Sequence, residues 1–191
     1  VAAQDLNGDG LPDLVVGTLG SHRLTMLLAR GDGSLTVGQR IDVGRFPHYM
    51  GFPDWNGDGG KDIAVVVAGE DSIDLLAGDG KGRFARRERL AAGVNPHGLA
   101  MADFNGDTIM DLVVSNRSSG DLTLFLGSGK GFNPGTSIAT GQDIIALGAG
   151  DLDRDGRADL ALVSASHHSV TTLRGDGQGG FASFASWQPA K

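Results

Sequence analysis

The chain has 191 residues, 40% of them hydrophobic, and a formal net charge of −7. This length is enough for one large domain or two small ones with a buried core. The acidic balance argues against a nucleic-acid partner, and no apolar run reaches the roughly 18 residues of a membrane-spanning helix, so membrane insertion is not expected. There is no cysteine, so disulfides cannot add stability. Glycine is abundant, and its 32 residues lie between short apolar runs, which indicates tight turns and an all-β protein.

An acidic motif recurs four times, at residues 5–13, 54–62, 103–111 and 151–159, with a period of 48 or 49 residues. A β-rich run follows each copy and predicts a strand (14–16, 63–67, 112–114 and 160–163). After a second strand and a glycine turn, a hydrophobic residue opens a third strand: Leu35, Phe84, Phe132 or Phe181. Further segments (50–53, 99–102 and 147–150) lead into the next motif. Four short strands in about 49 residues are typical of a propeller blade, and helix should be scarce.

We therefore predict an all-β protein: a single β-propeller domain over 1–191 with four four-stranded antiparallel blades. The repeats span approximately 1–47, 48–96, 97–144 and 145–191. No strand is left over to clasp a ring shut. Three arrangements stay open: four blades closed alone, two copies paired into a larger ring, or part of a larger propeller. Because an open arc exposes apolar blade faces, closure or self-association through those faces is favoured.

Each acidic motif offers hard oxygen ligands that suit Ca²⁺. Alternate side chains of a tight loop converge on one point, the seventh residue offers its backbone carbonyl, and the last Asp completes the ligand shell. The predicted ligands of up to four structural Ca²⁺ ions are Asp5, Asn7, Asp9, Asp13 with Leu11; Asp54, Asn56, Asp58, Asp62 with Gly60; Asp103, Asn105, Asp107, Asp111 with Ile109; and Asp151, Asp153, Asp155, Asp159 with Arg157.

An EF-hand begins with the same pattern but requires a Glu at loop position twelve and flanking helices. Position twelve is Val16, Val65, Val114 or Leu162 here, inside an apolar strand run, so the EF-hand is excluded. A turn without a metal is the other explanation, because Asn-Gly-Asp-Gly strings favour turns. The motif occurs four times at the same place in the repeat, and each copy keeps the last Asp, which disfavours a turn without a metal. The loops hold thirteen Asp, three in each of the first three and four in the last, and these would repel one another without a cation.

The four sites should not be equal. The third loop has Thr108 where the others have Gly10, Gly59 and Gly156. If this position needs a positive φ, a β-branched residue is strained there, and the third site should be the weakest. The fourth set holds four carboxylates and should bind tightest if the geometry is equal.

These residues and this period resemble the FG-GAP/VCBS repeats of integrin α-subunit propellers and of many bacterial secreted proteins and lectins. The resemblance covers nearly the whole chain. It implies blades whose innermost strand leads into the calcium loop, calcium that is structural rather than catalytic, and an extracellular or periplasmic location. The sequence differs from this family in the number of blades, since such propellers usually have seven blades and this chain has four repeats. No signal-peptide pattern is visible in the sequence.

The leading functional hypothesis is a non-catalytic binding module for protein–protein or adhesive contacts, because no nucleophile, phosphate-loop or zinc motif is found. The alternatives are calcium-dependent, lectin-like carbohydrate binding and an accessory domain of a larger secreted enzyme. Sugar-stacking tryptophans are few, since Trp55 lies in an acidic loop and Trp187 lies near the end of the sequence, which counts against carbohydrate binding. The candidate ligand surface is the rim opposite the calcium loops: His22, Arg23, Arg45, His48, Tyr49, Asn95, His97, Asn116, Arg117, His167 and His168.

Overall fold

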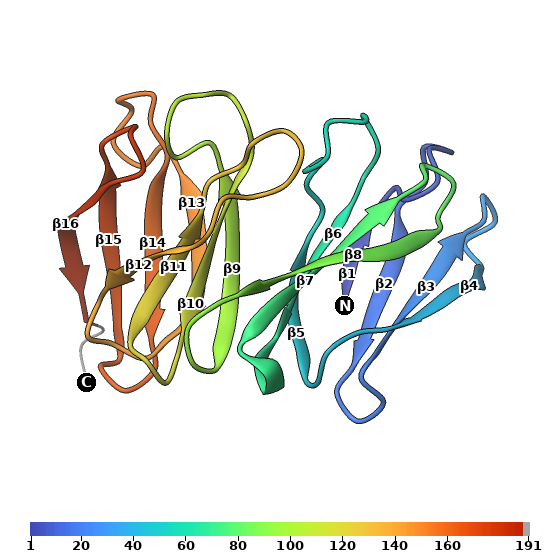
Figure 1. Cartoon of the computed structure of the whole chain (residues 1–191), viewed down its shortest axis with the longest axis horizontal. Coiled ribbons are helices and arrows are strands. Elements are labelled where there is room, and N and C mark those ends of the chain that lie inside the picture. The colour runs from blue at the N-terminus through green and yellow to red at the C-terminus, as the bar shows by residue number, and fades with distance from the viewer. Residues whose placement is uncertain (189–191) are drawn as a thin grey trace.

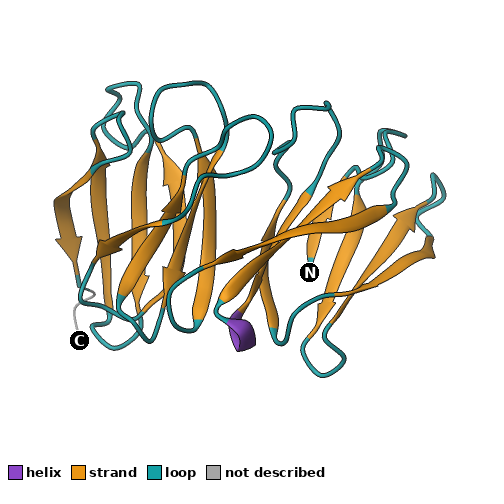
Figure 2. Ribbon diagram, viewed as in Figure 1, coloured by secondary structure: helices purple, strands orange, loops and turns teal. Residues whose placement is uncertain are grey.

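The computed structural model describes residues 1–188, and almost all of their regular structure is β-strand (Figures 1 and 2). Sixteen strands form four antiparallel four-stranded sheets, and the strands of each sheet lie in sequence order. Within these residues the one helical element is a short 3₁₀ turn, η1 (Ala68–Glu70). No helix in this range is long and apolar enough to cross a membrane. The prediction of an all-β fold with four four-stranded blades is confirmed.

The four blades follow one another along the chain. Blade 1 contains β1 (Ala2–Gln4), β2 (Asp13–Thr18), β3 (Arg23–Ala29) and β4 (Leu35–Asp42). Blade 2 contains β5 (Pro47–Gly51), β6 (Ile63–Val67), β7 (Ser72–Gly78) and β8 (Phe84–Ala91). Blade 3 contains β9 (Pro96–Ala102), β10 (Asp111–Asn116), β11 (Asp121–Phe125) and β12 (Thr136–Ala139). Blade 4 contains β13 (Ile144–Gly150), β14 (Asp159–Ser164), β15 (Ser169–Gly175) and β16 (Phe181–Trp187).

One predicted strand start is wrong. Leu35, Phe84 and Phe181 open β4, β8 and β16, but Phe132 makes only an isolated bridge to Gly127, and β12 begins at Thr136. Pro134 lies in the intervening segment and has no backbone N–H to give to a strand ladder. The outer strand of blade 3 is therefore shorter than its counterparts.

The core lies between the sheets, where neighbouring blades pack face to face. Three apolar clusters fill the spaces between blades 1 and 2, 2 and 3, and 3 and 4. Every residue of β6 is buried, because blade 2 has a neighbour on both faces. In β2, buried and half-buried residues alternate, because blade 1 packs against a blade on one face only. This difference explains why the continuous apolar run of the sequence falls in a middle blade.

The four blades do not close into a ring in this chain. Blades 1 and 4 lie at opposite ends of the molecule (Figure 1). Leu152 of blade 4 is 51% exposed, whereas its repeat counterparts Leu6 and Phe104 are 2% exposed beneath the following blade. Of the three predicted arrangements, closure of four blades alone is therefore not what the structure has, and both end faces carry exposed apolar side chains.

The acidic motifs all lie at one end of the sheets. Each one connects the first strand of its blade to the second, and the glycine turns between the third and fourth strands lie at the same end. First strands β5, β9 and β13 are neighbours, so the strand that precedes each of these acidic loops is on the inner side of the array. Antiparallel strand order thus gathers the four motifs on one rim.

Candidate metal centres

The first Asp of each motif organises the backbone of its loop. Asp5 Oδ1 accepts the N–H of Gly8 (2.8 Å) and Asp5 Oδ2 accepts that of Gly10 (2.9 Å). The hydrogen bond from Gly10 contributes most to holding the pKa of the Asp5 carboxyl below its usual value. The same two positions donate to Asp54 and to Asp103. The backbone of each of these loops therefore folds around the carboxylate of its first Asp, and these hydrogen bonds need no metal ion.

The last Asp of each motif is buried and joins two parts of its blade. Asp62 and Asp111 are fully buried, as is Asp13, and Asp159 is 2% exposed. In all four, Oδ2 accepts the N–H of the second loop residue and Oδ1 accepts an N–H at the end of the third strand. Burial raises the pKa of the Asp62 and Asp111 carboxyls above the usual value for Asp. Each last Asp thus links the acidic loop to the neighbouring glycine turn.

The fourth loop brings carboxylates together most closely. Oxygens of Asp151, Asp153 and Asp159 all lie within 4.8 Å of one another, and no other group of three acidic, His or Cys side chains in the described residues does so. Three converging carboxylates are a donor set that fits a hard divalent cation such as Ca²⁺. In the first three loops the Asn amide instead donates to the middle Asp, as Asn56 does to Asp58 (2.9 Å).

The remaining predicted ligand positions are on the same loops. The N–H groups of Leu11, Gly60, Ile109 and Arg157 each donate to the middle Asp of their motif, at 2.8–2.9 Å. Their backbones therefore lie beside the carboxylate cluster. Their role as carbonyl ligands stays a prediction.

An arginine outside the predicted ligand set forms ion pairs with the fourth acidic loop. Arg174, at the end of β15, places its Nε 2.7 Å from Asp153 Oδ2 and its Nη2 3.1 Å from Asp155 Oδ2. The equivalent residues of blades 2 and 3 are Ala77 and Leu126, which cannot make such a contact. The fourth loop has more carboxylates than the others, but two of them already have a cationic partner.

Two loops carry a residue in a backbone conformation that favours glycine. Thr108 has φ +68°, and the equivalent Gly10 has φ +84°. The premise of the prediction about the third site is therefore met, and a β-branched residue is strained there. The fourth loop has Arg154 at φ +66°, where the other loops have glycine. Strain is thus not confined to the third loop.

The acidic loops also contact the following blade. The Gly82 N–H of blade 2 donates to the Leu6 carbonyl of blade 1 (3.0 Å), and Gly179 of blade 4 donates to Phe104 of blade 3 (2.9 Å). A Cβ added at Gly57 would lie 3.0 Å from the Gly129 carbonyl oxygen of the next blade. The conformation of each of these loops is therefore coupled to the packing between blades.

Of the eleven residues predicted on the rim opposite the acidic loops, one is buried and the others are half-buried or exposed. Asn116 is fully buried, and its amide donates to Asp121 Oδ1 and Thr123 Oγ1, so including it in a ligand surface was wrong. His48 and His97 do lie together, with ring centroids 4.7 Å apart. His97 Nδ1 is 2.7 Å from the Ile145 carbonyl oxygen of the next blade, which indicates a packing role for this ring.

The fold and the loops define a β-propeller repeat protein with an acidic hairpin loop in each blade. Its sequence matches the model of the FG-GAP-like repeat three times, at residues 5–65, 54–114 and 104–162. The chain belongs to the FG-GAP-like repeat family. None of the curated proteins compared with it matches.

Solved structures of low sequence identity share the fold. A candidate 6-phosphogluconolactonase from Bacteroides fragilis has a TM-score of 0.74 and 15% identity over 98% of this chain and 54% of that one. BBS1N, crystallised in complex with ARL6DN, has a TM-score of 0.68 and 13% identity over 98% of this chain and 55% of that one. A protein of unknown function from Desulfotomaculum acetoxidans has a TM-score of 0.70 and 12% identity, over 96% and 59%. The chain spans little more than half the length of these structures.

Proposed function

We propose that this chain is a calcium-stabilised β-propeller module that makes contacts with other proteins and has no catalytic role of its own. The observation that carries the proposal is the buried last Asp of each motif, which ties the acidic loop to the glycine turn of its blade. A cation bound in the acidic loop would neutralise the exposed carboxylates of that loop, which lie next to the buried Asp. Calcium would then hold the blade in shape.

The residues that would hold the ion are the side chains at the first, third, fifth and ninth positions of each loop, with the carbonyl of the seventh. Bound calcium would supply positive charge that relieves repulsion between carboxylates. Four Ca²⁺ ions, with eight positive charges, would change the formal net charge from −7 to +1. Family membership supports calcium in these loops, because FG-GAP-like repeats are often associated with it.

Binding is proposed rather than catalysis because the dense carboxylate clusters of the sequence lie in the four loops. Protein contact is favoured over carbohydrate binding because Trp55 is only 7% exposed and packs between blades. Trp187, at the end of β16, is 62% exposed but is a single ring with no counterpart in the other blades. An extracellular or periplasmic location is part of the proposal, since free calcium is plentiful there. These assignments follow the family resemblance and the chemistry of the loops.

The exposed end faces support self-association. Leu35 of blade 1 is 46% exposed, whereas the equivalent Phe84 is 4% exposed beneath blade 1. Leu152 is exposed on the other end face, at the position that the following blade covers elsewhere. The two faces are therefore the two halves of an interface that recurs inside the chain. Solution mass tests this: a single-chain mass at high concentration would contradict it.

Calcium stoichiometry tests the central part of the proposal. Equilibrium dialysis followed by metal analysis should find up to four Ca²⁺ per chain. Replacing Asp62 with Asn should remove one of them, because a buried ligand is lost at one loop only. Absence of bound calcium at millimolar free concentration would overturn the proposal.

A further inference from the structure

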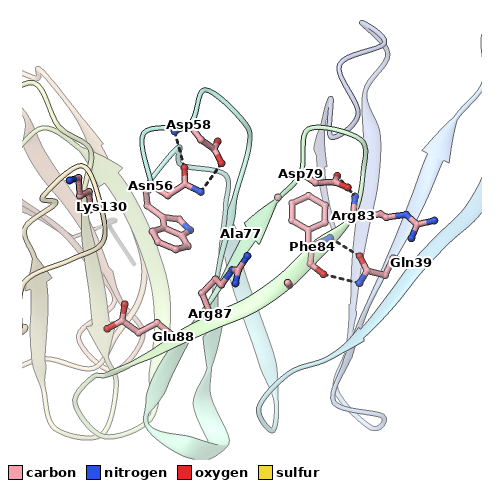
Figure 3. A pocket seen from close by; sticks show the side chains of 13 residues that line it. Gln39, Asn56, Asp58, Ala77, Asp79, Arg83, Phe84, Arg87, Glu88 and Lys130 are labelled. Carbon is pink, nitrogen blue, oxygen red and sulfur yellow. Dashed lines mark hydrogen bonds between the residues drawn. The ribbon is translucent and has the colours of Figure 1, made fainter.

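A groove of about 700 Å³ runs over the outer part of blade 2 (Figure 3). It reaches Gln39 on β4 of blade 1 and Lys130 in the turn between β11 and β12 of blade 3. This volume is in the range of ligand-binding sites in proteins. Three cationic side chains line the groove: Arg83 and Arg87, just before the start of β8 and within it, and Lys130 of blade 3.

These three cations have no ionic partner within residues 1–188. None of them is among the ion pairs of this range. On the same strand, by contrast, Arg89 Nε lies 2.7 Å from the buried Asp74 Oδ1, and Arg86 Nε lies 3.7 Å from the same atom. Strand β8 therefore carries structural arginines as well as an arginine that the fold does not use.

Arg83 and Arg87 belong to blade 2 and Lys130 belongs to blade 3, and the two arginines have no cationic counterpart in the other blades. Strand β8 has three arginines, whereas β4 has one and β12 and β16 have none. Arg87 also occupies a β-bulge, since Glu88 pairs with Leu75 and Arg86 pairs with Leu76. A bulge re-aims the side chain it holds. Blades 1 and 4 have a bulge at the equivalent place, so the bulge belongs to the blade architecture. The set of arginines on the outer strand occurs in one repeat of four and is not needed to build a blade, which favours a role in binding.

A hydrogen-bond donor without a partner lies at the same groove. Trp55, which lines it, is 7% exposed, and its Nε1 is buried with no acceptor among the described residues. A buried N–H that lacks an acceptor is costly. An anionic ligand would offer oxygen acceptors at this place as well as charge for the arginines.

Three carboxylates also line the groove, and two of them are engaged. Asp79 Oδ1 accepts the N–H groups of Lys81 and Arg83, at 2.8 and 3.1 Å. Asp58 is one of the proposed calcium ligands, so a bound Ca²⁺ would offset its charge. The Glu88 side chain is exposed and has no hydrogen bond or ion pair within residues 1–188. The groove would therefore be positive when calcium occupies the loop at 54–62.

We propose that this groove binds an acidic segment of a partner protein, with Arg83, Arg87 and Lys130 pairing its carboxylates. The edge of β8 already takes an amide partner: Gln39 Nε2 donates to the Phe84 carbonyl (2.8 Å) and Gln39 Oε1 accepts the Phe84 N–H (2.6 Å). An extended peptide can bind a strand edge in the same manner. The covered ring of Trp55 offers no platform for an acidic sugar. The inference deepens the proposed protein-contact function, and only its calcium dependence rests on the proposed metal sites.

The test is a binding titration of the whole chain with a short poly-glutamate peptide, in calcium and in calcium-free buffer. Poly-glutamine of the same length and oligogalacturonate are the comparison ligands. Poly-glutamate should bind, more tightly in calcium. The triple variant Arg83→Gln, Arg87→Gln, Lys130→Gln should bind it about tenfold more weakly, the sum of three modest ion pairs. Its melting temperature checks that it remains folded.

A matched triple variant controls for net charge. Arg30→Gln, Arg40→Gln and Arg117→Gln remove the same charge from exposed positions outside the groove and outside the acidic loops, and should leave binding unchanged. Equal loss in both triples, or preference for oligogalacturonate or poly-glutamine, would overturn the inference. If binding depends on the groove but not on calcium, the groove stands and the proposed occupancy of the loop at 54–62 fails.

Discussion

Arg174 Nε lies 2.7 Å from Asp153 Oδ2, so the fourth acidic loop has an internal cation at one of its proposed ligands. The arginine comes from the end of β15 and also reaches Asp155. Charge count alone favoured this loop as the tightest calcium site. The contact means that calcium must compete with a guanidinium for two of its carboxylates.

Removal of this arginine should strengthen the fourth site. We expect Arg174→Ala to raise its calcium affinity by up to about fivefold, because an exposed ion pair is worth about 0.2–1 kcal/mol. Calorimetric titration measures the change. Arg30→Ala is the matched control, since Arg30 has the same place in blade 1 and forms no ion pair within residues 1–188. If both variants behave alike, Arg174 does not compete with calcium.

The third loop should become more stable with glycine at its strained position. Thr108→Gly relieves a positive φ of 68° at a β-branched residue. The gain should be about 1 kcal/mol, or about 2–4 °C in melting temperature for a chain of this size. The reverse change at an equivalent position, Gly59→Thr, should lower the melting temperature. Unchanged melting in both variants would remove strain as the reason for a weak third site.

Two alanine substitutions distinguish the stability lost through a clash with the next blade from the stability lost through backbone strain. Gly57→Ala places a Cβ 3.0 Å from the Gly129 carbonyl oxygen at φ +74°, whereas Gly10→Ala, at φ +84°, meets no atom of the described residues within 4 Å. Both should destabilise through strain by about 1 kcal/mol, and Gly57→Ala should do so further. Chemical denaturation measures both. If both substitutions lower the free energy of unfolding equally, the Gly129 carbonyl of blade 3 moves away from the added Cβ without a cost in stability.

Calcium stabilisation should weaken as the pH falls. Burial raises the pKa of the Asp62 and Asp111 carboxyls in the calcium-free fold, and calcium requires them deprotonated. The folded calcium-free chain binds these protons more readily than the unfolded chain. These two groups therefore favour the calcium-free fold as the pH falls from above the raised pKa to the unfolded value of about 3.9.

The increase in melting temperature caused by calcium should accordingly be smaller at about pH 5 than at about pH 7. The double variant Asp62→Asn, Asp111→Asn lacks both titrating groups, so its calcium response should depend less on pH. An increase that is the same at both pH values in the unmodified chain would show that these carboxyls do not control binding.

The repeat made most of the fold predictable from sequence. Its period and β-branched runs predict the blades, and the acidic motifs fall on the loops between first and second strands as expected. The contacts that the sequence missed join residues far apart in the repeat. Arg174 meets Asp153 across two strands, and Lys130 meets the groove of blade 2 only because blades 2 and 3 pack together.

Two local errors have equally local causes. Phe132 opens no strand because Pro134 follows and cannot donate to a ladder. The sequence places Asn116 on the rim opposite the calcium loops, but Asn116 ends β10 and its amide N–H donates to Thr123 Oγ1 inside the blade. A hydrophobic pattern does not reveal which polar side chain finds a buried partner.

The decisive measurement is thermal unfolding of the unmodified chain in saturating calcium and in calcium-free buffer, with magnesium as the control cation. If buried aspartates and a bound ion together hold each blade in shape, calcium should raise the melting temperature by at least about 5 °C. Magnesium should do so much less. Melting at the same temperature with and without calcium would contradict the account.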